Sequence, residues 1–150
     1  MTSKFPLQSL LDLSNLRLDE ATRRLGELVS SEMQANQRLE LLVQYRGEYH
    51  TRFLAAARNG LAPDQWRNYQ SFLERLDAAV SQAQELVTQS RQRKEEGQKE
   101  WLDKRGRVKA FDTLAHRHQA RADYAERKQE QKAQDEHSAR KHHVKSKDQD

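Results

Sequence analysis

The stretch RNGLAPD, residues 58–64, is the strongest interruption in a chain whose sequence otherwise favours helix. Gly60 suits the left-handed residue that ends a helix, and Leu61 can fold back against the last turn. Pro63 suits the first turn of a new helix, where its missing N–H costs no hydrogen bond. The sequence therefore predicts a short turn at residues 58–62 between two helices.

An apolar heptad repeat precedes this turn. Counted forward in alternating steps of four and three, twelve of fifteen positions are apolar, which is typical of a coiled-coil seam. We therefore expect a helix over about residues 5–57. Three charge pairs at i,i+4 are expected to add about 0.2–0.5 kcal/mol each: Asp19–Arg23, Glu20–Arg24 and Glu48–Arg52. The positions of this first seam are Leu7, Leu11, Ser14, Leu18, Ala21, Leu25, Leu28, Glu32, Ala35, Leu39, Leu42, Arg46, Tyr49, Phe53 and Ala56.

A second seam follows the turn, and thirteen of its eighteen positions are apolar. It predicts a helix over about residues 63–130. Residues 89–96 contain no apolar side chain, so the seam there is either locally polar or shifted in register by a stutter. The positions are Trp66, Tyr69, Leu73, Leu76, Val80, Ala83, Val87, Ser90, Lys94, Gly97, Trp101, Lys104, Val108, Phe111, Ala115, His118, Ala122 and Ala125.

The composition agrees with long helices. Valine, leucine and phenylalanine make up 19% of the 150 residues and isoleucine is absent, so composition alone leaves disorder open. Alanine, glutamate, lysine, leucine and arginine make up 49%, which is typical of coiled coils, and the heptads favour that class. Large apolar residues nearly stop after Leu114, which predicts a charged, disordered tail over residues 131–150.

The short turn makes the two helices antiparallel neighbours. We therefore expect an all-α fold, a long antiparallel two-helix coiled-coil hairpin over residues 1–130 with a disordered C-terminal tail. Further self-association stays open. The register predicts that three pairs of residues lie near one another: Phe53 and Trp66, Leu39 and Val80, Leu7 and Phe111.

The sequence gives little support for catalysis or for a bound cofactor. It has no cysteine, no glycine-rich phosphate loop and no nucleophile elbow, so we expect no enzyme. Five of the six histidines lie in residues 116–143, where a solvated tail is favoured over a metal site. Carboxylates interleave with the basic residues of 91–109, which argues against nucleic-acid binding. Without an apolar stretch of ~18–20 residues or a secretory signal, we expect a cytoplasmic protein.

Two aromatic residues stand one step off the seams. Tyr45 and Phe72 flank the groove about three helical turns from the turn region. They either widen a thin two-helix core or form a docking site for another protein. Together with four neighbours they define the flanking patch: Leu42, Tyr45, Tyr49, Phe72, Leu76 and Ala79.

The chain resembles the flagellar export chaperone family FliJ, a component of the flagellar type III secretion apparatus. The resemblance covers most of residues 5–130. The segments that carry it are FPLQSLLDLSN, LRLDEATRRLGEL, YRGEYHTRF, the NG of the turn and WRNYQSFLERLDAA. It implies an antiparallel two-helix coiled coil similar to part of the stalk of rotary ATPases, and a general chaperone or adaptor role in export of flagellar proteins.

The resemblance also implies partners. The paired chain ends, roughly residues 5–28 and 105–130, would bind the hexameric export ATPase. The flanking patch would bind the cytoplasmic domain of the membrane export gate, and substrate-specific export chaperones would be further partners. The protein would thus lie at the inner membrane only through other proteins.

Two positions depart from the family pattern, Arg38 and Ala83. The other candidate function is a generic coiled-coil structural or tethering protein. The residues expected at the ATPase-binding ends are Leu7, Leu11, Leu18, Leu25, Val108 and Phe111.

Overall fold

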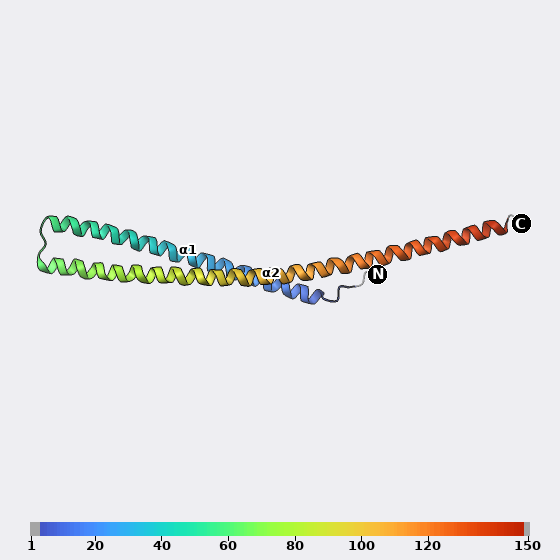
Figure 1. The fold of residues 1–150 in the computed structure, drawn as a ribbon, viewed down its shortest axis with the longest axis horizontal. Coiled ribbons are helices and arrows are strands. Elements are labelled where there is room, and N and C mark those ends of the chain that lie inside the picture. Colours follow the sequence, from blue (N-terminus) through green and yellow to red (C-terminus); the bar gives the residue numbers. More distant parts are fainter. Residues whose placement is uncertain (1–3, 149–150) are drawn as a thin grey trace. The chain divides into compact units, whose positions relative to one another are not determined.

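Two long helices make up nearly all of the computed structural model, which describes residues 4–148 (Figure 1). Helix α1 spans Gln8–Arg58 and helix α2 spans Pro63–Lys147, and the described residues contain no strand. This confirms the predicted helical hairpin. Residues 1–3 of the predicted hairpin and residues 149–150 of the predicted tail lie outside the described residues.

The turn has the predicted chemistry. Gly60 has a φ of 84°, and no other described residue has a positive φ. The N–H groups of Asn59 and Gly60 donate to carbonyls of the last turn of α1, at 3.2 Å each. At the start of α2, the Gln65 side chain accepts the Ala62 N–H at 3.3 Å, as in half of a capping box. A left-handed glycine therefore ends α1, and a proline at the first position opens α2.

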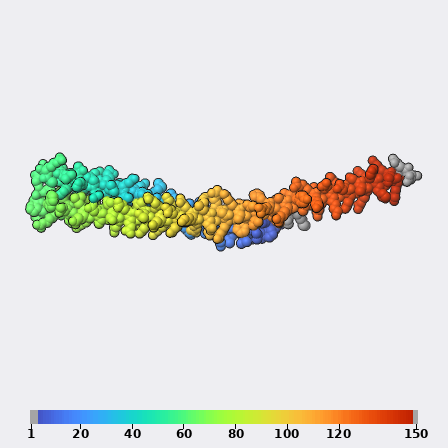
Figure 2. Space-filling model, in the orientation of Figure 1, coloured from blue at the N-terminus to red at the C-terminus, as the bar shows by residue number. Residues whose placement is uncertain are grey.

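The structure divides into two compact units, each of which pairs a part of α1 with a part of α2. In residues 19–103 the helices run side by side up to the turn, and in Figure 2 their side chains form a continuous surface there. The rings of Phe53 and Trp66 lie 5.2 Å apart, which confirms the expected neighbours. The other unit comprises residues 4–18 and 104–148, and the rings of Phe5 and His118 meet within it at 5.7 Å.

Both predicted seams face inward. Of all the seam positions, only Arg46, Trp66 and Ala125 are exposed, while the others are buried or half-buried. The predicted heptads therefore identify the core correctly. Its buried apolar members are Leu11, Ala21, Phe53, Leu76, Val80, Ala83, Val87 and Val108.

The polar stretch of α2 keeps the heptad register, so the seam is locally polar and there is no stutter. Glu32 enters the seam from α1 with a side chain only 13% exposed, and its carboxylate lies 2.6 Å from Lys94 Nζ and 3.8 Å from Arg91 Nε. At the next seam position, three residues after Lys94, Gly97 is buried. A Cβ there would lie 2.6 Å from a methyl carbon of Leu28. An ion pair and a close backbone approach thus replace apolar pairs in this part of the core.

The three i,i+4 charge pairs expected within α1 do not form among the described residues, so that prediction is wrong. Arg24 instead reaches across to α2, where its guanidinium lies 2.8 Å and 2.9 Å from the two carboxylate oxygens of Glu100. Trp101 Nε1 donates to the Thr22 hydroxyl at 2.9 Å on the same part of the hairpin. Arg24 therefore pairs with Glu100 on the facing helix and not with Glu20 on its own helix.

The end of α2 differs from the sequence-based boundary. We expected disorder from residue 131, but α2 continues as a helix to Lys147. Every described residue after Ala122 is exposed. This segment contains no glycine or proline and is rich in alanine, lysine, arginine, glutamine and glutamate, which favour helix without any packing. The loss of the apolar pattern thus marks the end of packing and not the end of the helix.

Candidate protein-docking surfaces

The flanking patch is assembled in the structure. The ring of Phe72 on α2 lies 4.5 Å from the ring of Tyr49 and 6.3 Å from the ring of Tyr45, both on α1, and meets Tyr45 edge to face. Tyr45 is 46% exposed, whereas Tyr49 and Phe72 are half-buried. Leu42 and Ala79, also half-buried, belong to the same patch. The sequence thus correctly brings together aromatic residues that lie 23 to 27 positions apart.

One member of the predicted patch lies in the core. Leu76 is only 6% exposed, so it supports the patch from below and offers almost no contact area. Ala83 is 3% exposed, so the residue at this position contributes to the packing between the helices and not to their surface. Arg38, in contrast, is exposed.

The hydroxyl of Tyr49 has a raised pKa. Burial raises the pKa of Tyr49 above the usual 10.0 for tyrosine, and the phenols of Tyr69 and Tyr45 raise it further. The neutral phenol is therefore the form that the patch holds at physiological pH.

The aromatic cluster continues from the patch to the turn. The ring of Tyr69 lies 5.4 Å from that of Tyr49 and 5.6 Å from that of Phe53, and Trp66 follows on the other side of Phe53. Trp66 is 43% exposed. The heptad spacing predicts Tyr69 and Trp66 as core residues, but a core of two helices is too thin to cover rings of this size.

A shallow hollow of about 570 Å³ lies beside the turn, next to the patch. Tyr49 and Tyr69 form part of its wall. Arg52 is the only charged side chain that lines it. The complete lining is Tyr49, Arg52, Ala56, Asn59, Gly60, Leu61, Gln65, Asn68 and Tyr69.

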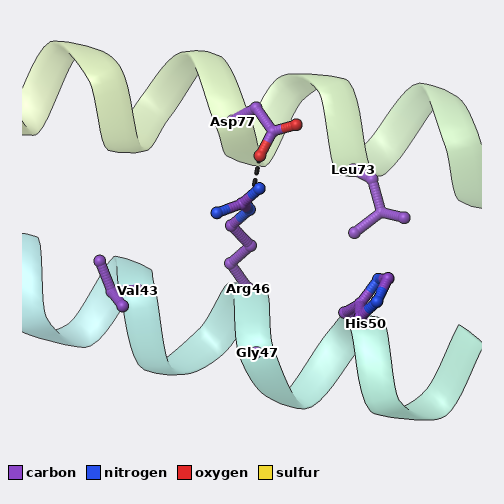
Figure 3. A pocket seen from close by; sticks show the side chains of 6 residues that line it. All are labelled: Val43, Arg46, Gly47, His50, Leu73 and Asp77. Carbon is purple, nitrogen blue, oxygen red and sulfur yellow. Dashed lines mark ion pairs between the residues drawn. The ribbon is translucent and has the colours of Figure 1, made fainter.

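A different hollow, of about 500 Å³, lies on the other flank of the seam (Figure 3). Val43, Gly47 and His50 border it on α1, and Leu73 borders it on α2. The guanidinium of Arg46 lies 2.5 Å from the carboxylate of Asp77 and bridges the two helices there (Figure 3). Both charges of this second hollow are therefore already paired.

The residues predicted at the chain ends are mostly packing residues. Leu11 and Val108 are buried, and Leu7, Leu18 and Phe111 are half-buried, within the unit of residues 4–18 and 104–148. Leu25, which belongs to the other unit, is half-buried, and its methyl carbon would lie 3.7 Å from a Cβ added at Gly97. These side chains hold the helices together and leave little area for a partner.

Three other leucines at the start of α1 are exposed, and the sequence analysis missed them. Leu10 is 46% exposed, Leu13 is 41% exposed and Leu16 is 60% exposed. These leucines lie beside the seam leucines, so apolar side chains cover more of the first three turns of α1 than the seam requires. Such exposed apolar side chains commonly mark a contact with another protein. The signal was present in the sequence LQSLLDLSNL, residues 7–16, whose leucines exceed the two per heptad that a seam uses.

Within residues 4–148, no three histidine, aspartate or glutamate side chains lie close enough together to hold a metal ion. Neither helix contains, in that range, a segment long and apolar enough to span a membrane.

Comparison with known proteins agrees with the geometry. A family model described as Flagellar FliJ protein matches residues 3–147. A Flagellar FliJ protein of Salmonella typhi is 36% identical over 134 residues, which cover 89% of this chain and 91% of the relative. A Flagellar FliJ protein of Escherichia coli (strain K12) is 31% identical over 134 residues, which again cover 89% of this chain and 91% of the relative. The chain therefore belongs to the FliJ family of flagellar proteins.

Proposed function

We propose that the chain is an adaptor of the flagellar type III protein export apparatus. The flanking patch binds the cytoplasmic domain of the membrane export gate, and the unit that contains both chain ends binds the hexameric export ATPase. Substrate-specific export chaperones are further partners. The protein has no chemistry of its own and acts through the packing of its surfaces against those partners.

One observation carries this proposal. Tyr45 and Phe72, from different helices, form an edge-to-face pair that leaves Tyr45 nearly half exposed. Tyrosine is enriched in the central contacts of protein interfaces, because a large rigid ring with a hydroxyl gains contact area at little entropic cost. A hairpin that only tethered other proteins would not need an exposed tyrosine at this position.

The test is the double variant Tyr45→Ala/Phe72→Ala. We expect its affinity for the purified cytoplasmic domain of the gate to fall by about tenfold or more, because truncation of a central aromatic contact commonly costs ~2 kcal/mol. Isothermal titration calorimetry with the full chain measures this.

The matched control is Leu54→Ala, which removes a leucine that is 48% exposed and lies outside the patch. Circular dichroism must show that all variants keep their helices. Unchanged gate binding by a folded double variant would show that the patch is not the docking site.

A further inference from the structure

The hollow beside the turn extends the flanking patch along the same flank of the seam. Arg52 lies one heptad after Tyr45 on α1, and Gln65 lies one heptad before Phe72 on α2. Residues one heptad apart occupy the same side of a coiled-coil helix. Tyr49 and Tyr69 line the hollow, and Tyr49 also contacts Phe72 in the patch. A segment that covers the patch and continues toward the turn therefore enters the hollow.

The charge of the hollow is one-sided. Arg52 lines it, and no aspartate or glutamate does. Glu48, the expected partner of Arg52, instead lies within 3.4 Å of the Gln44 amide, and Arg52 makes no ion pair within residues 4–148. By contrast, Arg24 and Arg46 each reach a carboxylate on α2. Arg52 is thus a cation whose five N–H donors stay available to a partner.

Neutral residues that can form hydrogen bonds line the same hollow as this cation. Asn59 and Asn68 line the hollow, and the side-chain amide of each can donate two N–H groups. Beside a guanidinium, such donors favour an anionic group with several acceptor oxygens. Guanidinium and carboxylate fit each other in a bidentate geometry, which gives both strength and orientation.

The choice of basic residue along the hairpin points to a protein partner. Residues 5–93 contain eleven arginines and no lysine, whereas residues 94–150 contain nine lysines and six arginines. Arginine is enriched and lysine depleted at protein interfaces, because the planar guanidinium is more weakly hydrated and stacks on aromatic rings. The part of the chain that holds the flanking patch thus has the composition of a contact surface.

We propose that the hollow beside the turn receives a carboxylate side chain of the gate-derived segment that covers the flanking patch. Arg52 binds this carboxylate, and the amides of Asn59 and Asn68 complete its coordination. An apolar side chain next to the carboxylate packs on Tyr45 and Phe72. This inference rests on the proposed gate-binding function and adds the chemistry of the bound segment, which is an acidic residue adjoining an apolar one.

The experiment compares Arg52→Gln and Arg52→Lys in the full chain, titrated with the purified cytoplasmic domain of the gate at 50 and 300 mM NaCl. We expect Arg52→Gln to weaken binding about tenfold at low salt and to reduce its salt dependence. Arg52→Lys keeps the charge but loses the bidentate geometry, so it should fall between Arg52→Gln and the unmodified chain. Arg67→Gln is the control, since Arg67 is exposed near the turn but does not line the hollow.

The outcomes separate this inference from the proposed function. If Tyr45→Ala/Phe72→Ala abolishes gate binding while Arg52→Gln binds normally, the carboxylate site is wrong and the docking function stands. If both variants bind normally, the docking function is wrong, and the inference fails with it. An equal loss in Arg52→Gln and Arg67→Gln would indicate a general charge effect and would also overturn the inference.

Discussion

Among single residues, Glu32 and Lys94 show how the hairpin tolerates charge inside its seam. Both occupy seam positions, and their charged atoms lie 2.6 Å apart with the Glu32 side chain largely buried. Removal of one partner from such a pair leaves the other charge desolvated, whereas replacement of both by apolar residues is often neutral or stabilising.

We therefore predict that Glu32→Leu lowers the free energy of unfolding by about 1–3 kcal/mol, while Glu32→Leu/Lys94→Leu restores or exceeds the original stability. Urea unfolding followed by circular dichroism measures both. Equal destabilisation by the single and the double variant would show that the pair is not coupled. Arg24→Leu serves as a comparison, because the ion pair of Arg24 with Glu100 is much more exposed.

Ionisation of Tyr49 makes the stability of the hairpin depend on pH in the alkaline range. Its pKa is raised in the folded state, so between the unfolded and folded pKa values the folded chain binds more protons. This contribution to stability is fully present below pH ~10 and is lost as the pH rises through the folded pKa. We expect Tyr49→Phe to show a smaller decrease in the free energy of unfolding between pH 9 and 11. Identical pH profiles for the two proteins would contradict this assignment.

At the scale of the helices, α2 changes character along its length. Its part near the turn packs through buried residues such as Leu76, Val80 and Val87, whereas all described residues after Ala122 are exposed. Helical backbone without tertiary contacts opens readily, because each hydrogen bond is then stabilised only by its neighbours in the helix.

We therefore predict that the amides of residues 123–147 exchange with deuterium at least a hundredfold faster than those of residues 76–87 in the free chain. Hydrogen exchange followed by mass spectrometry measures this with the full chain. Comparable protection in both segments would show that another contact covers the end of α2.

At the scale of the whole molecule, the two compact units offer different surfaces. The unit of residues 19–103 carries the flanking patch, and the other unit carries the exposed leucines at the start of α1. A partner for each unit would explain why both expose apolar side chains.

This arrangement predicts that Leu10→Ser/Leu13→Ser/Leu16→Ser reduces binding to the export ATPase about tenfold or more and leaves gate binding unchanged. Pull-down with each purified partner measures the two effects separately. Leu41→Ser is the control, since Leu41 is 67% exposed but belongs to the other unit. Normal ATPase binding by the triple variant would contradict the role of these leucines.

Much of the fold could be predicted from the sequence because heptads and turn residues act locally. Gly60 and Pro63 place the turn, and a strict four-three spacing identifies which side chains are buried. The spacing also continues through the polar stretch at residues 89–96, where apolar content alone would suggest a break. The end of α2 was misplaced because intrinsic propensity, and not packing, keeps that segment helical.

The candidate docking surfaces were harder to predict, because the exposure of a side chain depends on the facing helix. The sequence could bring Tyr45 and Phe72 together, but it could not show that Leu76 is covered or that Leu16 is not. Which charged residues pair with each other was hard to predict for the same reason. Arg24 has a carboxylate four residues away, yet it pairs with Glu100 on α2, 76 positions further along the chain.

The close approach of Gly97 to Leu28 has a consequence for recognition. Glycine leaves room for that leucine in its present position. A hairpin displaced by one heptad would instead bring Leu28 against Ser90 or Lys104 and would separate the charged groups that pair across the two helices. The same displacement would separate Tyr45 from Phe72, about 10 Å apart along the axis after one heptad. A partner that contacts both rings at once would therefore bind only hairpins whose two helices are correctly aligned.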